Sequence, residues 1–169
     1  MNFTTAPELR TERLLLRGYR REDFDAFATY YASPRSRFTD GPVDRQRAWE
    51  MFTGGAGRWQ IAGHGAWTIE RKSDRIAIGL VSLNTAIELP EPELGWILWE
   101  KFEGFGYAFE ATMAARRFAF EELGWSRLLS GVSRDNERSI RLAERLGATH
   151  APEVQVPHET DTKFFWHTR

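Results

Sequence analysis

Hydrophobic positions along the chain follow two different periods. Apolar residues recur at spacings of three and four in four segments, and this predicts amphipathic helices over residues 21–31, 44–52, 106–124 and 136–146. Short runs rich in apolar and β-branched residues, bounded by turn-forming residues, predict strands over residues 14–19, 66–71, 76–83, 93–99, 127–132 and 162–168.

Turn and capping residues set the predicted boundaries. Ser33-Pro34 is expected to end the first helix, and Asp44 is a suitable N-cap for the second. Gly54-Gly55-Ala56-Gly57 is interpreted as a break after that second helix. Lys72-Ser73-Asp74 forms a hairpin loop between two predicted strands, and Gly147 is expected to stop the last helix.

The order of these elements predicts the fold class. A first strand and two helices precede three consecutive strands, which predict an antiparallel meander. A helix, a strand, a further helix and a last strand follow, so that the chain contains one strand–helix–strand unit. The 169 residues show no internal repeat or linker, and a single α/β domain over residues 1–169 is expected.

Composition narrows the classes of function. With 23 basic and 24 acidic residues, the net charge of -1 gives no general attraction to nucleic acid. The lack of cysteine excludes disulfides, thiolate zinc sites and cysteine nucleophiles, and the four histidines, including His158, lack metal-ligand spacing. No apolar run reaches the roughly 18 residues of a membrane span, and no signal peptide pattern is seen. We therefore expect a cytoplasmic protein that needs no metal and binds no membrane.

The most informative motif is a glycine turn in the middle of the chain. The predicted strand 93–99 leads through Gly104-Phe105-Gly106 directly into a long helix. Unpaired amides and the helix dipole at such a helix start favour a phosphate, and glycines let the backbone approach it. The turn alone is a weak signal, because glycines also occur in ordinary turns. Phe109 stands where the dinucleotide fingerprint needs a third glycine, so a Rossmann site is disfavoured.

Three motifs in order resemble the GCN5-related N-acetyltransferases, and in particular their RimJ/RimL-like branch. The first is Thr11-Glu12-Arg13-Leu14-Leu15-Leu16-Arg17, which is similar to the first strand of that branch. The others are 94–98 followed by the glycine turn 104–111, and the segment 136–148, which begins Asn-Glu-Arg-Ser and ends Leu-Gly-Ala. The resemblance implies a mostly antiparallel sheet of about six to seven strands flanked by about four helices.

The same resemblance implies a reaction. The acetyl group of acetyl-CoA would pass to a primary amine, of a protein N-terminus or a small molecule, by direct attack in a ternary complex. Ser139 is the candidate proton donor to the leaving thiolate, and Glu93 is the candidate general base. A backbone N–H near Leu98 would stabilise the developing oxyanion. The residues expected to bind acetyl-CoA are Leu98, Trp99, Glu103, Gly104, Phe105, Gly106, Tyr107, Ala108 and Asn136.

Departures from the family pattern keep other interpretations open. Phe105 stands where a basic residue is frequent in the turn, and Ala143 stands where many members carry a tyrosine acid. A catalytically inactive CoA-binding sensor or interaction module is therefore the alternative, and a nucleotide-binding protein is a third, weaker one. Asn136 is also a suitable helix N-cap, and Ser139 is equally an ordinary helix serine. The aromatic content of 14% leaves a homodimer open.

Overall fold

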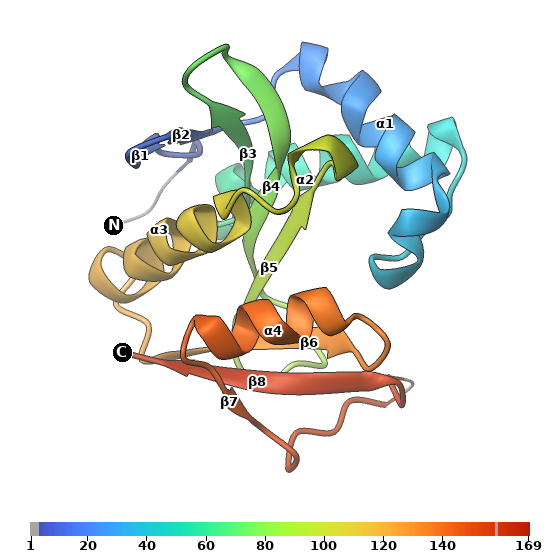
Figure 1. Cartoon of the computed structure of the whole chain (residues 1–169). Coiled ribbons are helices and arrows are strands. Elements are labelled where there is room, and N and C mark those ends of the chain that lie inside the picture. The colour runs from blue at the N-terminus through green and yellow to red at the C-terminus, as the bar shows by residue number, and fades with distance from the viewer. Residues whose placement is uncertain (1–3, 158) are drawn as a thin grey trace.

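The computed structural model describes residues 4–157 and 159–169 and contains one mixed sheet of eight strands (Figure 1). The spatial order is β1-β2-β3-β4-β5-β6-β8-β7, and only the β5–β6 pair is parallel. The strands are β1 (Leu9–Arg10), β2 (Leu14–Arg17), β3 (Ala66–Arg71), β4 (Ile76–Asn84), β5 (Glu93–Leu98), β6 (Arg127–Ser133), β7 (Thr149–His150) and β8 (Thr162–Thr168).

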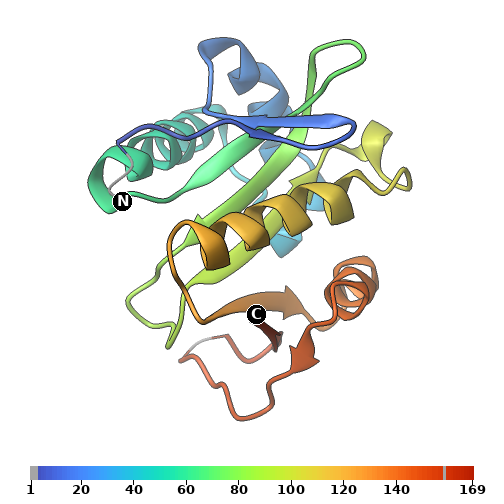
Figure 2. The same ribbon diagram turned by 90° about the vertical axis from the view of Figure 1, so that its left-hand side faces the viewer.

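Helices cover both faces of this sheet (Figure 2). One hydrophobic cluster joins α3 to the meander strands, and a second joins α1 and α2 to the opposite face through Leu80 and Ile97. The fourth helix packs beside β6 and β8 through Ala143, Val132 and Phe165. The helices are α1 (Phe24–Ala32), α2 (Arg45–Ala62), α3 (Tyr107–Glu121) and α4 (Glu137–Arg145), with 3₁₀ turns η1 (Arg21–Asp23), η2 (Pro34–Phe38) and η3 (Glu100–Phe102).

The predicted fold class is confirmed. All six predicted strands are present, strands β3 to β5 form the antiparallel meander, and β5–α3–β6 is the parallel unit. The two further strands, β1 and β7, are two residues long each. Segments of that length are too short to show the alternation from which strands are predicted.

The predicted helix break at residues 54–57 is wrong. Helix α2 continues through these glycines to Ala62 and ends at Gly63, which has a φ of 72°. Phe52 and Trp59 are both buried and lie two helical turns apart, so the apolar face of the helix continues across the glycine segment. A Cβ at Gly55 would lie 3.3 Å from a ring carbon of Tyr19. The glycine therefore permits close packing of Tyr19, and this packing outweighs the low helix propensity of glycine.

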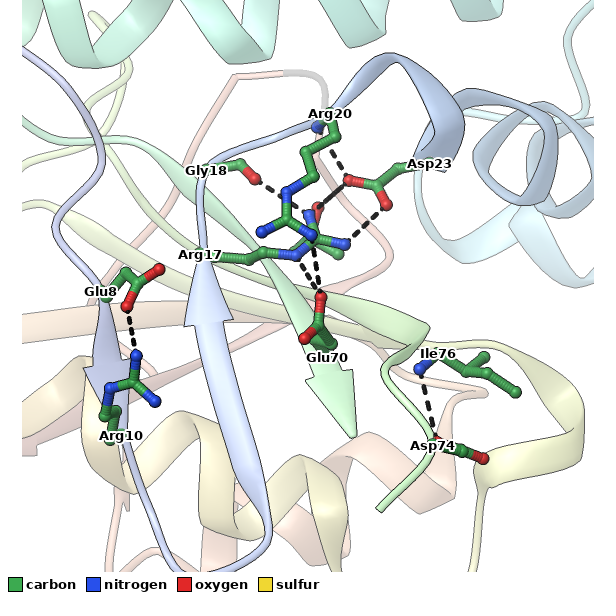
Figure 3. Close-up of polar contacts among 10 residues, drawn as sticks. Glu8, Arg10, Arg17, Gly18, Arg20, Asp23, Glu70, Asp74 and Ile76 are labelled. Carbon is green, nitrogen blue, oxygen red and sulfur yellow. Dashed lines mark hydrogen bonds and ion pairs between the residues drawn. The ribbon is translucent and has the colours of Figure 1, made fainter. Parts of the chain in front are cut away.

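A buried ionic network ties β2 to β3 and to η1 (Figure 3). Arg17 on β2 donates through Nη1 and Nη2 to Asp23 at 2.7 and 2.9 Å, and through Nε to Glu70 on β3 at 2.6 Å. All three residues are 5% exposed or less. Burial alone would raise the pKa of the Asp23 carboxyl, but hydrogen bonds from Arg17, the Arg20 backbone and Thr68 hold it below its usual value. The network thus fixes the start of α1 against the sheet.

Candidate active site

Strands β5 and β6 are paired only at one end. Their parallel register consists of Glu93 opposite Leu129, next to a hydrogen bond from Leu129 N to Pro92 O. Beside this pair, Ser130 Oγ donates to Leu94 O at 2.6 Å and lies 2.9 Å from Nε2 of the fully buried His167 on β8. Burial, reinforced by the charge of Arg116, lowers the pKa of His167 to about 4. The His167 imidazole is therefore neutral at neutral pH, and it lies next to the point at which the two strands part.

Backbone groups of β5 face the gap beyond that point. Trp99 N donates to Ile78 O, and Leu98 lies opposite Gly79 in the antiparallel ladder with β4. Because N–H groups of an antiparallel strand point alternately to its two sides, the N–H groups of Trp96 and Leu98 point away from β4. They are directed to the side on which β6 has diverged. The expected donor near Leu98 is thus available for an acceptor in the gap.

A pocket of about 490 Å³ opens along this side of β5. Its walls come from β5, the glycine turn, the start of α3, helix α4 and the segment around η2. We call it the arginine-rich pocket because five arginines line it: Arg35, Arg37, Arg138, Arg141 and Arg145. Of the residues expected to bind acetyl-CoA, those lining the pocket are Leu98, Glu103, Gly104, Gly106, Ala108 and Asn136.

The glycine turn has the backbone geometry expected of an anion site. Gly104 and Gly106 have φ angles of 84° and 81°, which glycine adopts without strain, and Gly106 is the N-cap of the 15-residue helix α3. Arg13 braces the turn, because its Nη1 donates to Phe105 O at 2.9 Å and its Nε pairs with Glu110 at 2.7 Å. The first amides of α3 are therefore held at the mouth of the pocket with the positive end of the helix dipole.

Three of the expected acetyl-CoA-binding residues direct their side chains elsewhere. Tyr107 is buried in the core cluster of α3, and Phe105 is 58% exposed and stacks on the Tyr107 ring. The Trp99 ring lies beside Tyr30, in the cluster of α1 and α2. None of these three residues lines the arginine-rich pocket.

Helix α4 brings Asn136 and Ser139 to the edge of the pocket. Asn136 is the N-cap, since its Oδ1 accepts from the backbone N of Ser139 at 3.2 Å. The cap leaves the Asn136 amide NH₂ and the Ser139 hydroxyl without further hydrogen bonds to the part of the chain that the structure describes. Both side chains line the arginine-rich pocket and also a second pocket across β5.

The second pocket, of about 870 Å³, contains Glu93, and we call it the Glu93 pocket. Burial raises the pKa of the Glu93 carboxyl, opposed by a hydrogen bond from Gly131 N at 3.3 Å and reinforced by Glu159 and Asp40. These three carboxylates come from β5, from the loop before β8 and from the segment after η2, and all line the pocket. The residues shared by both pockets are Arg37, Phe38, Thr39, Trp96, Ile97, Asn136 and Ser139.

The arginines of the first pocket were not predicted from the sequence. Arg138, Arg141 and Arg145 lie at spacings of three and four on α4, so a basic helix face could have been found from the sequence. Arg35 and Arg37 come from η2, far away along the chain, and no local pattern signals their approach. Together the five arginines place positive charge in the pocket, whereas Phe105 in the glycine turn is uncharged.

Within residues 4–157 and 159–169, no group of three or more His, Cys, Asp or Glu side chains is arranged to hold a metal ion. His158 lies outside the described residues. Across the same ranges, no helix combines the length and apolar character needed to cross a bilayer.

Comparison with known proteins assigns this architecture. Residues 13–149 match the acetyltransferase (GNAT) domain family. The uncharacterized N-acetyltransferase YoaA of Bacillus subtilis is 28% identical over 145 residues, which are 83% of this chain and 82% of the relative. A crystal structure of an acetyltransferase from Agrobacterium tumefaciens is 39% identical and has a TM-score of 0.91, covering 98% of this chain and 96% of that one.

More distant solved structures share the fold. A proposed ribosomal-protein-serine acetyltransferase from Vibrio cholerae superposes with a TM-score of 0.77 at 21% identity, covering 98% of this chain and 99% of that one. RimL, a ribosomal L7/L12 α-N-protein acetyltransferase solved in complex with coenzyme A, superposes with a TM-score of 0.78 at 15% identity, covering 96% and 98%.

Proposed function

The chain belongs to the GNAT family of acetyltransferases, and on that premise we propose that it transfers the acetyl group of acetyl-CoA to a primary amine by direct attack in a ternary complex. The observation that carries this proposal is the meeting of two pockets at the gap between β5 and β6. The arginine-rich pocket suits a phosphorylated cosubstrate, and the Glu93 pocket suits an amine. Asn136 and Ser139 lie where the two pockets join.

The residues of the arginine-rich pocket fit coenzyme A. Positive-φ glycines and the start of α3 offer backbone amides to a pyrophosphate. Nε of Arg35 is buried without an acceptor among the described residues, so one strong donor has capacity for a phosphate oxygen. Acetyl-CoA supplies the thioester carbonyl that the amine attacks, with a C–N bond formed and the C–S bond broken.

Three hydrogen-bond donors near the junction of the two pockets have proposed roles in the reaction. The Leu98 N–H would donate to the carbonyl oxygen as negative charge develops there, and such donors contribute roughly 3–4 kcal/mol each. The Ser139 hydroxyl, which has no other partner in residues 4–157 and 159–169, would donate to the departing thiolate. The Asn136 amide would hydrogen-bond the pantetheine arm, and its cap would hold Ser139 at the junction.

Glu93 is the proposed general base for the acceptor amine. Its raised pKa brings the carboxylate closer to the pH at which a base is efficient. The neighbouring Asp40 and Glu159 carboxylates would favour a cationic amine in this pocket over a neutral or anionic molecule. The relative RimL is by its name an α-N-protein acetyltransferase, so protein N-termini and small amines are the acceptors to test.

A Glu93→Gln variant is expected to lose about tenfold in kcat/KM at neutral pH with an α-amine acceptor. The loss is modest for a general base, because an α-amine of pKa about 7.7–8.0 is already partly neutral. In the native enzyme, kcat at saturating amine should fall as the pH drops through the raised Glu93 pKa, since only the carboxylate accepts a proton. The variant should lack that acidic limb in a pH–rate profile.

The matched control for this experiment is Glu91→Gln. Glu91 pairs with Arg127 at 2.7 Å and lines neither pocket, so the same loss of charge occurs away from the junction. The control should keep both its rate and its acidic limb. An acidic limb that persists in Glu93→Gln would remove Glu93 from the role of base.

Binding of acetyl-CoA is the first test of the proposed function. Acetyl-CoA at about 100 times its dissociation constant should stabilise the native state by about 2.7 kcal/mol and raise the melting temperature by several degrees. ATP and NAD, each at the same concentration, are the controls. A shift with acetyl-CoA alone supports the proposal, and an equal shift with ATP or NAD favours a nucleotide-binding protein instead. Release of CoA on addition of amines then identifies the acceptor.

A further inference from the structure

Glu103 joins two arginines across the arginine-rich pocket. Its Oε1 accepts from Nη2 of Arg35 on η2, and its Oε2 accepts from Nη1 of Arg138 in the first turn of α4. Each carboxylate oxygen is thus engaged by a different element. The Glu103 side chain is 29% exposed, so these charge-assisted bonds are only partly screened by water. Glu103 itself lies just before the glycine turn, and its side chain connects η2, which follows α1, to helix α4.

Glu103 is also unusual in its electrostatic setting. It is the one acidic residue among the described residues that line this pocket, whereas five arginines line it. A single carboxylate therefore occupies a site that the surrounding charges make favourable for anions. The residue stands directly before Gly104, beside the backbone amides of the turn.

One nitrogen of the Arg35 guanidinium, Nε, has no hydrogen-bond partner among the described residues. Nη2 is bonded to Glu103, Nη1 is bonded to Glu100 at 3.3 Å, and Nε is buried without an acceptor in the part of the chain that the structure describes. Nε and Nη2 form one edge of the guanidinium, which binds a phosphate through two parallel hydrogen bonds. A phosphate oxygen pair would satisfy that edge, whereas the Glu103 carboxylate engages only half of it.

We propose that Glu103 is an internal substitute for a cofactor phosphate: it holds Arg35 and Arg138 in position until a phosphate of coenzyme A takes over their donors. This inference rests on the proposed use of acetyl-CoA. Binding then becomes an exchange, in which the pairs with Glu103 are lost as the pairs with phosphate form. The affinity for coenzyme A is lower than the arginines alone would allow, by the free energy of the pairs that Glu103 gives up.

The test is isothermal titration calorimetry of coenzyme A with the native protein and with Glu103→Gln. The variant keeps the shape of the side chain but loses the negative charge, so it should bind coenzyme A about threefold to tenfold more tightly, the scale of two partly exposed ion pairs. Arg35→Gln should bind more weakly than the native protein. Dephospho-CoA distinguishes the phosphates: the gain in Glu103→Gln persists if the pyrophosphate is the displacing group and disappears if it is the 3′-phosphate.

The chain offers a closely matched control in Glu100→Gln. Glu100 also pairs with Arg35, but it is 75% exposed and lies outside the pocket lining. Its replacement removes the same charge from nearly the same place and should change the affinity by less than about twofold. Equal gains in both variants would indicate a general charge effect and overturn the proposal.

Other outcomes are equally decisive. Unchanged or weaker binding by Glu103→Gln, with a melting temperature like that of the native protein, overturns the substitute role while leaving the proposed function intact. A variant that binds coenzyme A where the native protein does not would support the role strongly. Binding by neither protein would refute the proposed function, and the substitute role with it.

Discussion

Replacement of Ser139 by alanine is expected to lower kcat by about a hundredfold or more while leaving the dissociation constant of acetyl-CoA within about threefold. A proton donor to a leaving group contributes roughly 10²–10⁴-fold, whereas a single neutral hydroxyl adds little to the binding of so large a cosubstrate. Single-turnover and steady-state rates of CoA release, together with calorimetric binding of acetyl-CoA, measure the two effects separately.

This substitution should remove the Ser139 hydroxyl without disturbing helix α4. The Asn136 cap bonds the backbone N of Ser139 and not its hydroxyl, so alanine preserves the cap. Alanine also has the higher helix propensity, and the melting temperature should not fall. Ser126→Ala is the control, because Ser126 is exposed and lines neither pocket, and its rate should change by less than about threefold. Full activity in Ser139→Ala would mean that Ser139 is an ordinary helix residue without a catalytic role. A lack of activity in both the native protein and the variant would favour a CoA-binding module without catalysis.

The largest loss of stability is expected from Arg17→Met. Removal of the guanidinium leaves the buried carboxylates of Asp23 and Glu70 facing each other without their shared cation (Figure 3). Loss of one partner from a buried ionic group typically costs 3–5 kcal/mol, which corresponds to a fall in melting temperature of about 10 °C in a domain of this size. Calorimetric or denaturant unfolding at neutral pH measures this change.

The pH dependence of the same variant gives a second readout. In the native protein the contribution of Asp23 is present above the unfolded carboxyl pKa of about 4 and is lost as the pH falls through the lowered folded pKa. In Arg17→Met, acid protonates the Asp23 carboxyl and so removes a buried charge that has lost its cation. The difference in stability between the two proteins should therefore narrow below about pH 4.

The control for this network is the exposed pair Glu8–Arg10, drawn beside it in Figure 3. Its side chains are 49% and 66% exposed, and Arg10→Met should change stability by less than about 0.5 kcal/mol. An Arg17→Met variant as stable as Arg10→Met would mean that the network contributes specificity and not stability. Simultaneous replacement of all three network residues by apolar ones should recover much of the loss, because no buried charge is then left unpaired.

Local features of the fold were predictable because neighbouring residues determine them. The apolar periods placed the six longer strands, and Asp44 and Asn136 marked two helix starts that the structure confirms. The continuation of α2 through residues 54–57 was not predictable in the same way. Whether a glycine ends a helix depends there on the Tyr19 ring that packs against Gly55, and Tyr19 lies more than thirty residues away.

The candidate site likewise contains some features that the local sequence determines and others that only the tertiary structure sets. The sequence by itself determined the glycine turn, the start of α3 and the placing of Asn136 and Ser139 one helical turn apart, since each depends on backbone geometry within a few residues. Only the tertiary structure decided that Arg35 reaches Glu103, and that Asp40 and Glu159 share a pocket with Glu93. Such charges act through distance and burial, and the fold brings them together from segments that no local pattern relates.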